Sequence, residues 1–140
     1  MKHMKLTAVG ALLAANFFAP VSAPAAGSLP PEQTQGSISY VTGGVGKDEA
    51  DAMKAAAAEY PLSLEFVQHA TPRGEFLADV DVKIKDHAGR TVLETTSDGP
   101  FLLAKVPAGK YTVIAQARGQ TRTLHATVKP RSPEHLVVVW

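Results

Sequence analysis

The sequence of 140 residues contains no cysteine. No disulfide can therefore stabilise the fold, and thiol catalysis and a lipid anchor on an N-terminal cysteine are both excluded. Aromatic residues make up only 6% of the chain, with a single tryptophan. Because nucleic-acid recognition commonly combines basic with aromatic side chains, this scarcity argues against a nucleic-acid partner. Stability must come from an apolar core alone.

Long apolar runs are also scarce, since only residues 6–19 form one. Lysines precede this run, and proline and small residues follow it, which is the plan of a secretory signal peptide. The run is shorter than the roughly 20 residues that span a bilayer. We therefore expect a signal peptide over residues 1–25, cleaved after Ala23 or Ala25. The mature chain is then periplasmic or secreted, without a transmembrane span. The alternative is an amphipathic or buried N-terminal helix.

Acidic residues are absent between positions 99 and 133, although residues 32–98 contain 12 of them and only six basic residues. The acid-free region contains six bases, which are Lys105, Lys110, Arg118, Arg122, Lys129 and Arg131. We expect Lys110, Arg118, Arg122 and Lys129 to form a basic stripe that could bind an anionic glycan or lipid. The alternative is that these bases pair with the acidic first half of the chain.

A hydrophobic period of two dominates residues 77–117. Val80, Val82 and Ile84 alternate with charged residues, so one face of this strand can be buried and the other hydrated. Turn residues recur about every eight to twelve positions, which is typical of sandwiches and barrels. The expected strands cover residues 37–42, 62–68, 80–85, 90–96, 101–104, 110–117, 121–128 and 135–140. The pattern predicts one mainly β domain over residues 37–140, an antiparallel β-sandwich, after a flexible segment over residues 26–36.

A strand–helix–strand unit opens this domain. Residues 48–60 favour a helix, because Ala50, Met53, Ala57 and Tyr60 recur on one helical face. The glycine-rich segment 43–46 before the helix matches neither the Rossmann nor the Walker spacing. Acidic residues at the start of the helix would also repel a phosphate. We therefore interpret the segment as a tight turn between strand and helix.

The end of the chain predicts a final hairpin. Residues 130–133 contain two prolines and favour a turn that would pair Val128 near His135. The last strand, residues 135–140, shows no polar alternation. We therefore expect both of its faces to be covered, with Trp140 acting as a core plug or as a lid on the end of the sandwich.

No residues with the spacing of a catalytic or metal site stand out. His69, His87, His125 and His135 lack the i, i+4 or i, i+2 spacing that would bring two ligands together. Asp79 and Asp81 share a strand face, which a hydrated surface explains without a calcium or acid–base site. We expect no catalytic, cofactor or metal residues and no enzymatic activity. A hydrolase of unrecognised type is the alternative, and a deep pocket with converging carboxylates or histidines would favour it.

Residues 78–128 carry their turns and strands in a particular order. The motifs are Asp86-His87-Ala88-Gly89-Arg90, Thr96-Ser97-Asp98-Gly99, Phe101-Leu102-Leu103, Val106-Pro107-Ala108-Gly109-Lys110-Tyr111-Thr112-Val113 and Gly119. This order resembles the carboxypeptidase regulatory-like domain, a transthyretin-like (prealbumin-like) sandwich, with Val106 where that family has leucine. The whole chain is similar to small exported bacterial proteins that bear this domain.

The resemblance implies an accessory or adhesion-type module without catalytic residues. Exposed sheet edges can accept a further strand. We therefore expect a non-enzymatic exported module that binds a protein partner in the cell envelope through its sheet edges and turn loops. Binding of an anionic glycan or lipid by the basic stripe is the alternative function.

Overall fold

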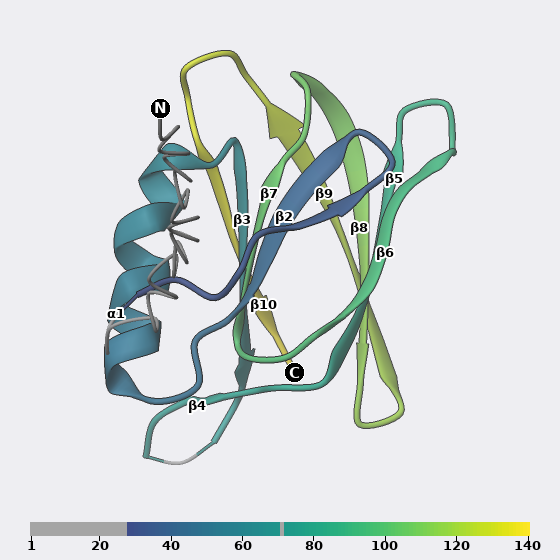
Figure 1. Ribbon diagram of the computed structural model, residues 1–140. Coiled ribbons are helices and arrows are strands. Elements are labelled where there is room, and N and C mark those ends of the chain that lie inside the picture. The colour runs from purple at the N-terminus through teal and green to yellow at the C-terminus, as the bar shows by residue number, and fades with distance from the viewer. Residues whose placement is uncertain (1–27, 71) are drawn as a thin grey trace, which may run out of the picture.

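The computed structural model describes residues 28–70 and 72–140, and these form two β-sheets with one helix packed outside them (Figure 1). The mainly β sandwich that the sequence predicts is confirmed. The expected signal peptide and its cleavage sites lie outside the described residues.

The smaller sheet, sheet B, has four antiparallel strands in the order β6-β5-β8-β9. These strands are β5 (Val80–Asp86), β6 (Thr91–Ser97), β8 (Gly109–Ala117) and β9 (Gln120–Val128). Alternation places Val80, Val82 and Ile84 in the core, as predicted. Arg118 and Gly119 connect β8 to β9 with φ values of 52° and 72°. Two consecutive positive φ angles are typical of the two-residue turn whose twist matches that of the hairpin, so this turn sets the register.

The larger sheet, sheet A, has the order β1-β2-β7-β3-β10, with the short β4 beside the end of β3. Its strands are β1 (Gln33–Gln35), β2 (Ile38–Gly43), β3 (Leu62–Gln68), β4 (Glu75–Phe76), β7 (Phe101–Lys105) and β10 (Glu134–Val139). All pairs are antiparallel except β3 and β10, which run parallel. Leu62, Leu64 and Phe66 of β3 point into the core between the two sheets.

The helix α1 (Lys47–Ala56) and the 3-10 turn Ala57–Glu59 cover part of the outer face of sheet A. Met53, fully buried, packs with Val41 of β2 and with Phe101 and Leu103 of β7. The helix therefore forms a third layer rather than a cap on one end. The expected apolar face is confirmed, except that Ala56 is buried and Ala57 only partly so.

The glycine-rich turn before α1 is closed by the helix itself. The carboxylate of Glu49 accepts a hydrogen bond of 2.8 Å from the backbone N–H of Gly44. A free backbone N–H is what a phosphate loop would offer to its ligand. Here an acidic side chain of the first helical turn takes that N–H, which agrees with a structural turn.

Three expectations for the chain ends were wrong. The final hairpin does not form, because β10 leaves sheet B and pairs with β3 of sheet A. Only Lys129 and Ser132 form an isolated bridge where the turn was expected. The outer face of β10 is not covered, since Val137 and Val139 are 46% and 48% exposed.

Residues 33–35, expected to be flexible, form β1 and pair with β2. Trp140 does act as a lid, packing edge-on against Phe66.

Polar contacts hold the segment before β1 against the sandwich. The Tyr60 hydroxyl donates to the carboxylate of Glu32 at 2.9 Å, and Lys105 Nζ lies 3.2 Å from the same carboxylate. The hydrogen bond from Tyr60, followed by that from Lys105, lowers the pKa of Glu32. Burial, followed by the hydrogen bond to Glu32, raises the pKa of Tyr60 to about 12.

The raised pKa of Tyr60 predicts a loss of stability at alkaline pH. An unfolded tyrosine ionises near pH 10, about two units below the folded value. The stabilisation is therefore complete below pH 10 and is lost as the pH rises to about 12. Denaturant unfolding across this range, with ionisation followed by ultraviolet absorbance, measures the loss. In Tyr60→Phe the loss should shrink, leaving the smaller part due to Tyr111, whose pKa is also raised by burial. Equal losses in both proteins would contradict the assignment.

Candidate functional site

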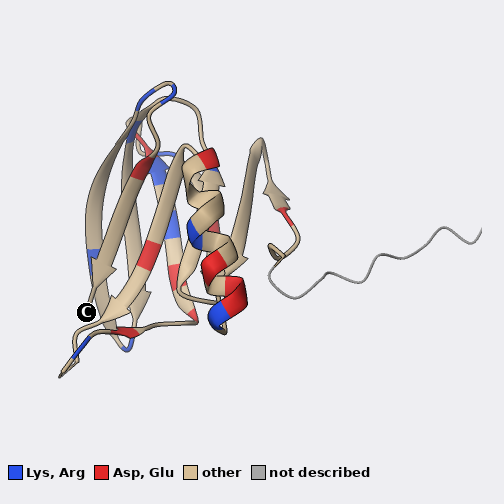
Figure 2. Cartoon of the chain, turned by 90° about the vertical axis from the view of Figure 1, so that its left-hand side faces the viewer, with Lys and Arg blue, Asp and Glu red and all other residues tan. Residues whose placement is uncertain are grey.

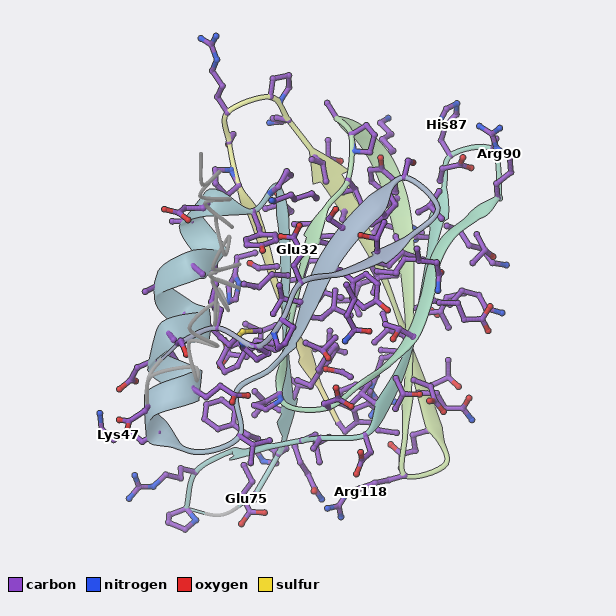
Figure 3. All side chains as sticks on the ribbon, viewed as in Figure 1. Glu32, Lys47, Glu75, His87, Arg90 and Arg118 are labelled. Carbon is purple, nitrogen blue, oxygen red and sulfur yellow. The ribbon has the colours of Figure 1, made fainter. Side chains whose placement is uncertain are left out.

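The four residues of the expected basic stripe do not share one surface. Lys110 lies near the start of β8, whereas Arg118 lies in the turn after its end. Eight strand residues separate their Cα atoms by roughly 26 Å. Figure 3 shows Arg118 and His87 at opposite ends of the sandwich. Lys110 lies at the His87 end, because both residues line the same hollow. The stripe expected from the sequence is therefore corrected to two separate basic ends.

Arg122 and Lys129 complete this correction. Arg122 pairs with the buried Ala115, so its side chain starts on the inner face of sheet B. Its Nε donates to the backbone oxygen of Val139 at 2.9 Å, which joins the edges of the two sheets. Lys129 follows β9 at the Lys110 end. Only Lys110 and Lys129 of the four therefore lie at one end and on exposed positions.

The alternative expectation, that the bases of residues 99–133 pair with acidic residues of the first half of the chain, holds for one base. Within the part of the chain that the structure describes, Lys105 is the only one of the six bases of residues 99–133 in an ion pair with a carboxylate, that of Glu32. The other ion pairs join Lys47 to Asp51, Lys83 to Glu94, Arg90 to Asp86 and His135 to Glu65. The acidic first half therefore leaves most of these bases unneutralised.

The uncovered half of sheet A forms a more extensive candidate surface. The helix packs on β2 and β7, while the strands on the side of the C-terminus lie beside it (Figure 2). On this outer face Val139 pairs with Val67, and Val67 pairs with Phe76. Directly paired residues point to the same face of a sheet. Phe76 is 51% exposed, although Lys54 Nζ of the helix lies 5.4 Å from the centre of its ring, so an apolar row extends from the edge of the helix at β4 to the outer strand β10.

The free edge of β10 adjoins this row. In a parallel pair, alternate residues direct their N–H and C=O groups to the neighbouring strand. Glu134 N donates to Pro61 O and Trp140 N donates to Val67 O, so the even-numbered residues of β10 face β3. His135, Val137 and Val139 therefore direct their backbone groups away from the sheet. Strand β9 of sheet B lies alongside β10, and its Arg122 bonds the backbone oxygen of Val139. We call His135, Val137 and Val139 the β10 edge.

A chain of three polar side chains joins β3 to β10 on the same face. Ser63 Oγ lies 2.7 Å from His135 Nδ1, and His135 Nε2 lies 3.3 Å from Glu65 Oε2. The order serine, histidine, carboxylate is that of a hydrolase relay. Ser63 is only 2% exposed, so a substrate carbonyl has no approach to its hydroxyl. The arrangement instead holds the parallel pair in register. Sequence reasoning missed it because His135 is 70 or more positions away from Ser63 and Glu65.

The opposite flank of the sandwich is closed differently. The Gln35 side chain donates from Nε2 to Glu94 O at 2.9 Å and accepts from Glu94 N at 2.7 Å. Its amide thus satisfies the outward backbone groups of Glu94 on the outer strand β6, as a pairing strand would. An unsatisfied edge is open to further strands. Of the two flanks, the one at β10 has the more exposed apolar surface, since Val137 and Val139 are 46% and 48% exposed.

Other kinds of site find little support in residues 28–70 and 72–140. No three histidine, aspartate, glutamate or cysteine side chains gather closely enough there to hold a metal ion. The hollows in this part of the chain are shallow surface features, including one of about 270 Å³ lined by Tyr60, Val106 and the segment 128–133. No helix in the described part is long and apolar enough to cross a bilayer.

These features define a helix-covered β-sandwich whose outer strand β10 carries exposed apolar side chains. No family model matches the chain, and no curated protein does. The resemblance to the carboxypeptidase regulatory-like domain therefore stays a prediction. Among solved structures the chain is similar to the TIE protein of Bacillus anthracis, at 16% identity and a TM-score of 0.44. That similarity covers 56% of this chain and only 16% of the length of the TIE protein.

Proposed function

We propose that the chain is a non-enzymatic binding module, periplasmic or secreted, that takes an extended segment of an envelope protein onto the β10 edge. The observation that carries the proposal is the coincidence of free backbone groups with exposed valines on one outer strand. Strand addition obtains affinity from main-chain hydrogen bonds and specificity from alternate side chains. The partner strand would place apolar side chains beside Val137 and Val139.

The small size of the edge favours a separate partner over a second copy of this chain. Self-pairing through β10 would involve six residues from each copy. A stable interface uses roughly 20–30 residues on each side. A partner that also covers the apolar row of Val67 and Phe76 would bury more surface than two β10 strands alone. The alternative expectation, glycan or lipid binding by a continuous basic stripe, loses support because the four bases are separated.

Amide hydrogen exchange tests the proposal. The mature chain is used to isolate partners from envelope extract, and each is identified by mass. Synthetic segments of the partner are then added to the isotope-labelled chain. We expect slowed exchange at the amides of His135, Val137 and Val139, with little change at Glu94 on the opposite flank. Slowed exchange confined to other surfaces would overturn the proposal. Slowed exchange at β10 that depends only on the concentration of the chain itself would also overturn it, because it would show self-association rather than binding of a partner.

A further inference from the structure

A second feature, independent of the β10 edge, lies on the outer face of sheet B. A hollow of about 260 Å³ is lined there by polar and basic side chains and by the backbone between them. The polar members of its lining are His87, Lys110, Thr112, His125 and Thr127. We call this site the histidine–lysine hollow. Two of the four histidines that showed no ligand spacing in the sequence meet here.

Strand register explains why these side chains meet. Lys110 pairs with Thr127 across β8 and β9, and Thr112 pairs with His125. These residues have the outward parity, since Tyr111 between them is buried. Lys85 of β5 pairs with Thr112 from the other side. Two adjacent rows of the sheet therefore bring Lys85, Lys110 and His125 to one surface, and His87 joins them from the turn after β5.

Carboxylates do not neutralise this group of bases. The hollow has none in its lining. The nearest acid along the chain, Asp86, accepts hydrogen bonds from the backbone N–H groups of Ala88 and Arg90 and from Arg90 Nε, all within 3.0 Å. Backbone and side-chain bonds from Arg90 hold the pKa of Asp86 below its usual range. The next acid on this face, Glu94, pairs with Lys83 one row further along.

We propose that the histidine–lysine hollow binds a tetrahedral oxyanion, a sulfate or phosphate group, and binds it more tightly when the histidines are protonated. Ammonium, imidazolium and hydroxyl groups supply several donors around one point. Hydrogen bonds to a charged acceptor are stronger than neutral ones. Like charges held close on one sheet face repel one another, and a bound anion removes that repulsion. Imidazole changes charge between about pH 5 and 8, which makes the affinity depend on pH.

Titration with sodium sulfate, followed by amide chemical shifts at constant ionic strength, tests this proposal. Sulfate keeps its charge over the range, so any pH dependence belongs to the protein. We expect saturable shifts at Thr112, His125 and Thr127, with binding about fivefold tighter at pH ~5.5 than at pH ~8. The double variant His87→Ala, His125→Ala should lose the pH dependence. Lys110→Ala should weaken binding about threefold at both values.

Arg118→Ala is the matched control, because it removes one exposed charge at the far end of β8. It should leave sulfate binding unchanged. Shifts that do not saturate, or an equal loss in Arg118→Ala and Lys110→Ala, would overturn the proposal in favour of diffuse attraction. If sulfate binds saturably, retention by phosphatidylglycerol vesicles would identify a lipid phosphate as the ligand, and retention by dextran sulfate would identify a glycan sulfate. Binding of sulfate alone would assign the hollow to a free anion.

Discussion

Val137→Pro is expected to abolish binding of a partner strand while leaving the sandwich folded. Proline lacks the backbone N–H and is tolerated on an outer strand where that N–H faces solvent. The N–H of Val137 is such a group, because the even-numbered residues of β10 bond to β3. The substitution also places a ring where an added strand must approach. We therefore expect at least a tenfold loss of affinity, about 1.4 kcal/mol or more.

Val137→Ala is the matched variant, since it keeps the N–H and removes only part of the exposed side chain. It should retain most of the binding, with a loss of about threefold from the missing apolar contact. Affinity for the captured partner segment is measured by calorimetry, and circular dichroism checks that both variants are folded. If Val137→Pro binds as well as Val137→Ala, the partner does not add a strand at β10. An unfolded Val137→Pro would contradict the backbone assignment on which the prediction rests.

Phe66→Ala is expected to cost about 3–5 kcal/mol of the free energy of unfolding. The Phe66 side chain is fully buried between the sheets and contacts Trp140 edge to face, with ring centroids 6.2 Å apart. Its removal leaves a cavity in the core and takes away the support of the terminal lid. Small domains have about 5–15 kcal/mol in total, and this chain has no disulfide to compensate. The variant should therefore be marginally folded at room temperature.

Val67→Ala, one residue further along β3, is the control for this experiment. Val67 belongs to the outer face and is only partly buried. Its truncation should cost about 1 kcal/mol or less. Urea unfolding of the two variants beside the unmodified chain gives both free energies. Equal losses would mean that β3 does not separate a buried inner face from a partly hydrated outer face.

The comparison between β5 and β10 shows how far the sequence could predict the fold. In β5 the alternation of Val80, Val82 and Ile84 with charged residues identified the buried face correctly. In β10 every position from Leu136 to Val139 is apolar, so alternation was hidden. The prediction that both faces of β10 are covered was wrong because one face packs in the core and the other has no third layer over it.

The candidate sites depended on pairing between distant segments. Lys110 was singled out from the sequence, but the histidines that share its hollow, His87 and His125, are brought near it only by the pairing of β5, β8 and β9. Arg118 and Arg122 were expected beside it and lie elsewhere. The cause is that charge along the sequence carries no information about which end of a strand, or which face, each base will occupy.

The sequence by itself determined the longer strands, the buried faces of those with clear alternation, the helix and most of the turns, because these follow from the local period of apolar residues and from turn chemistry. It did not show β1, β4 or the uncovered face of β10. Only the tertiary structure decided that β10 crosses to sheet A, that α1 covers half of that sheet, and which side chains meet on each surface. Those choices depend on which long-range contacts bury the most apolar surface and leave the fewest backbone groups unsatisfied, and no single segment contains that information.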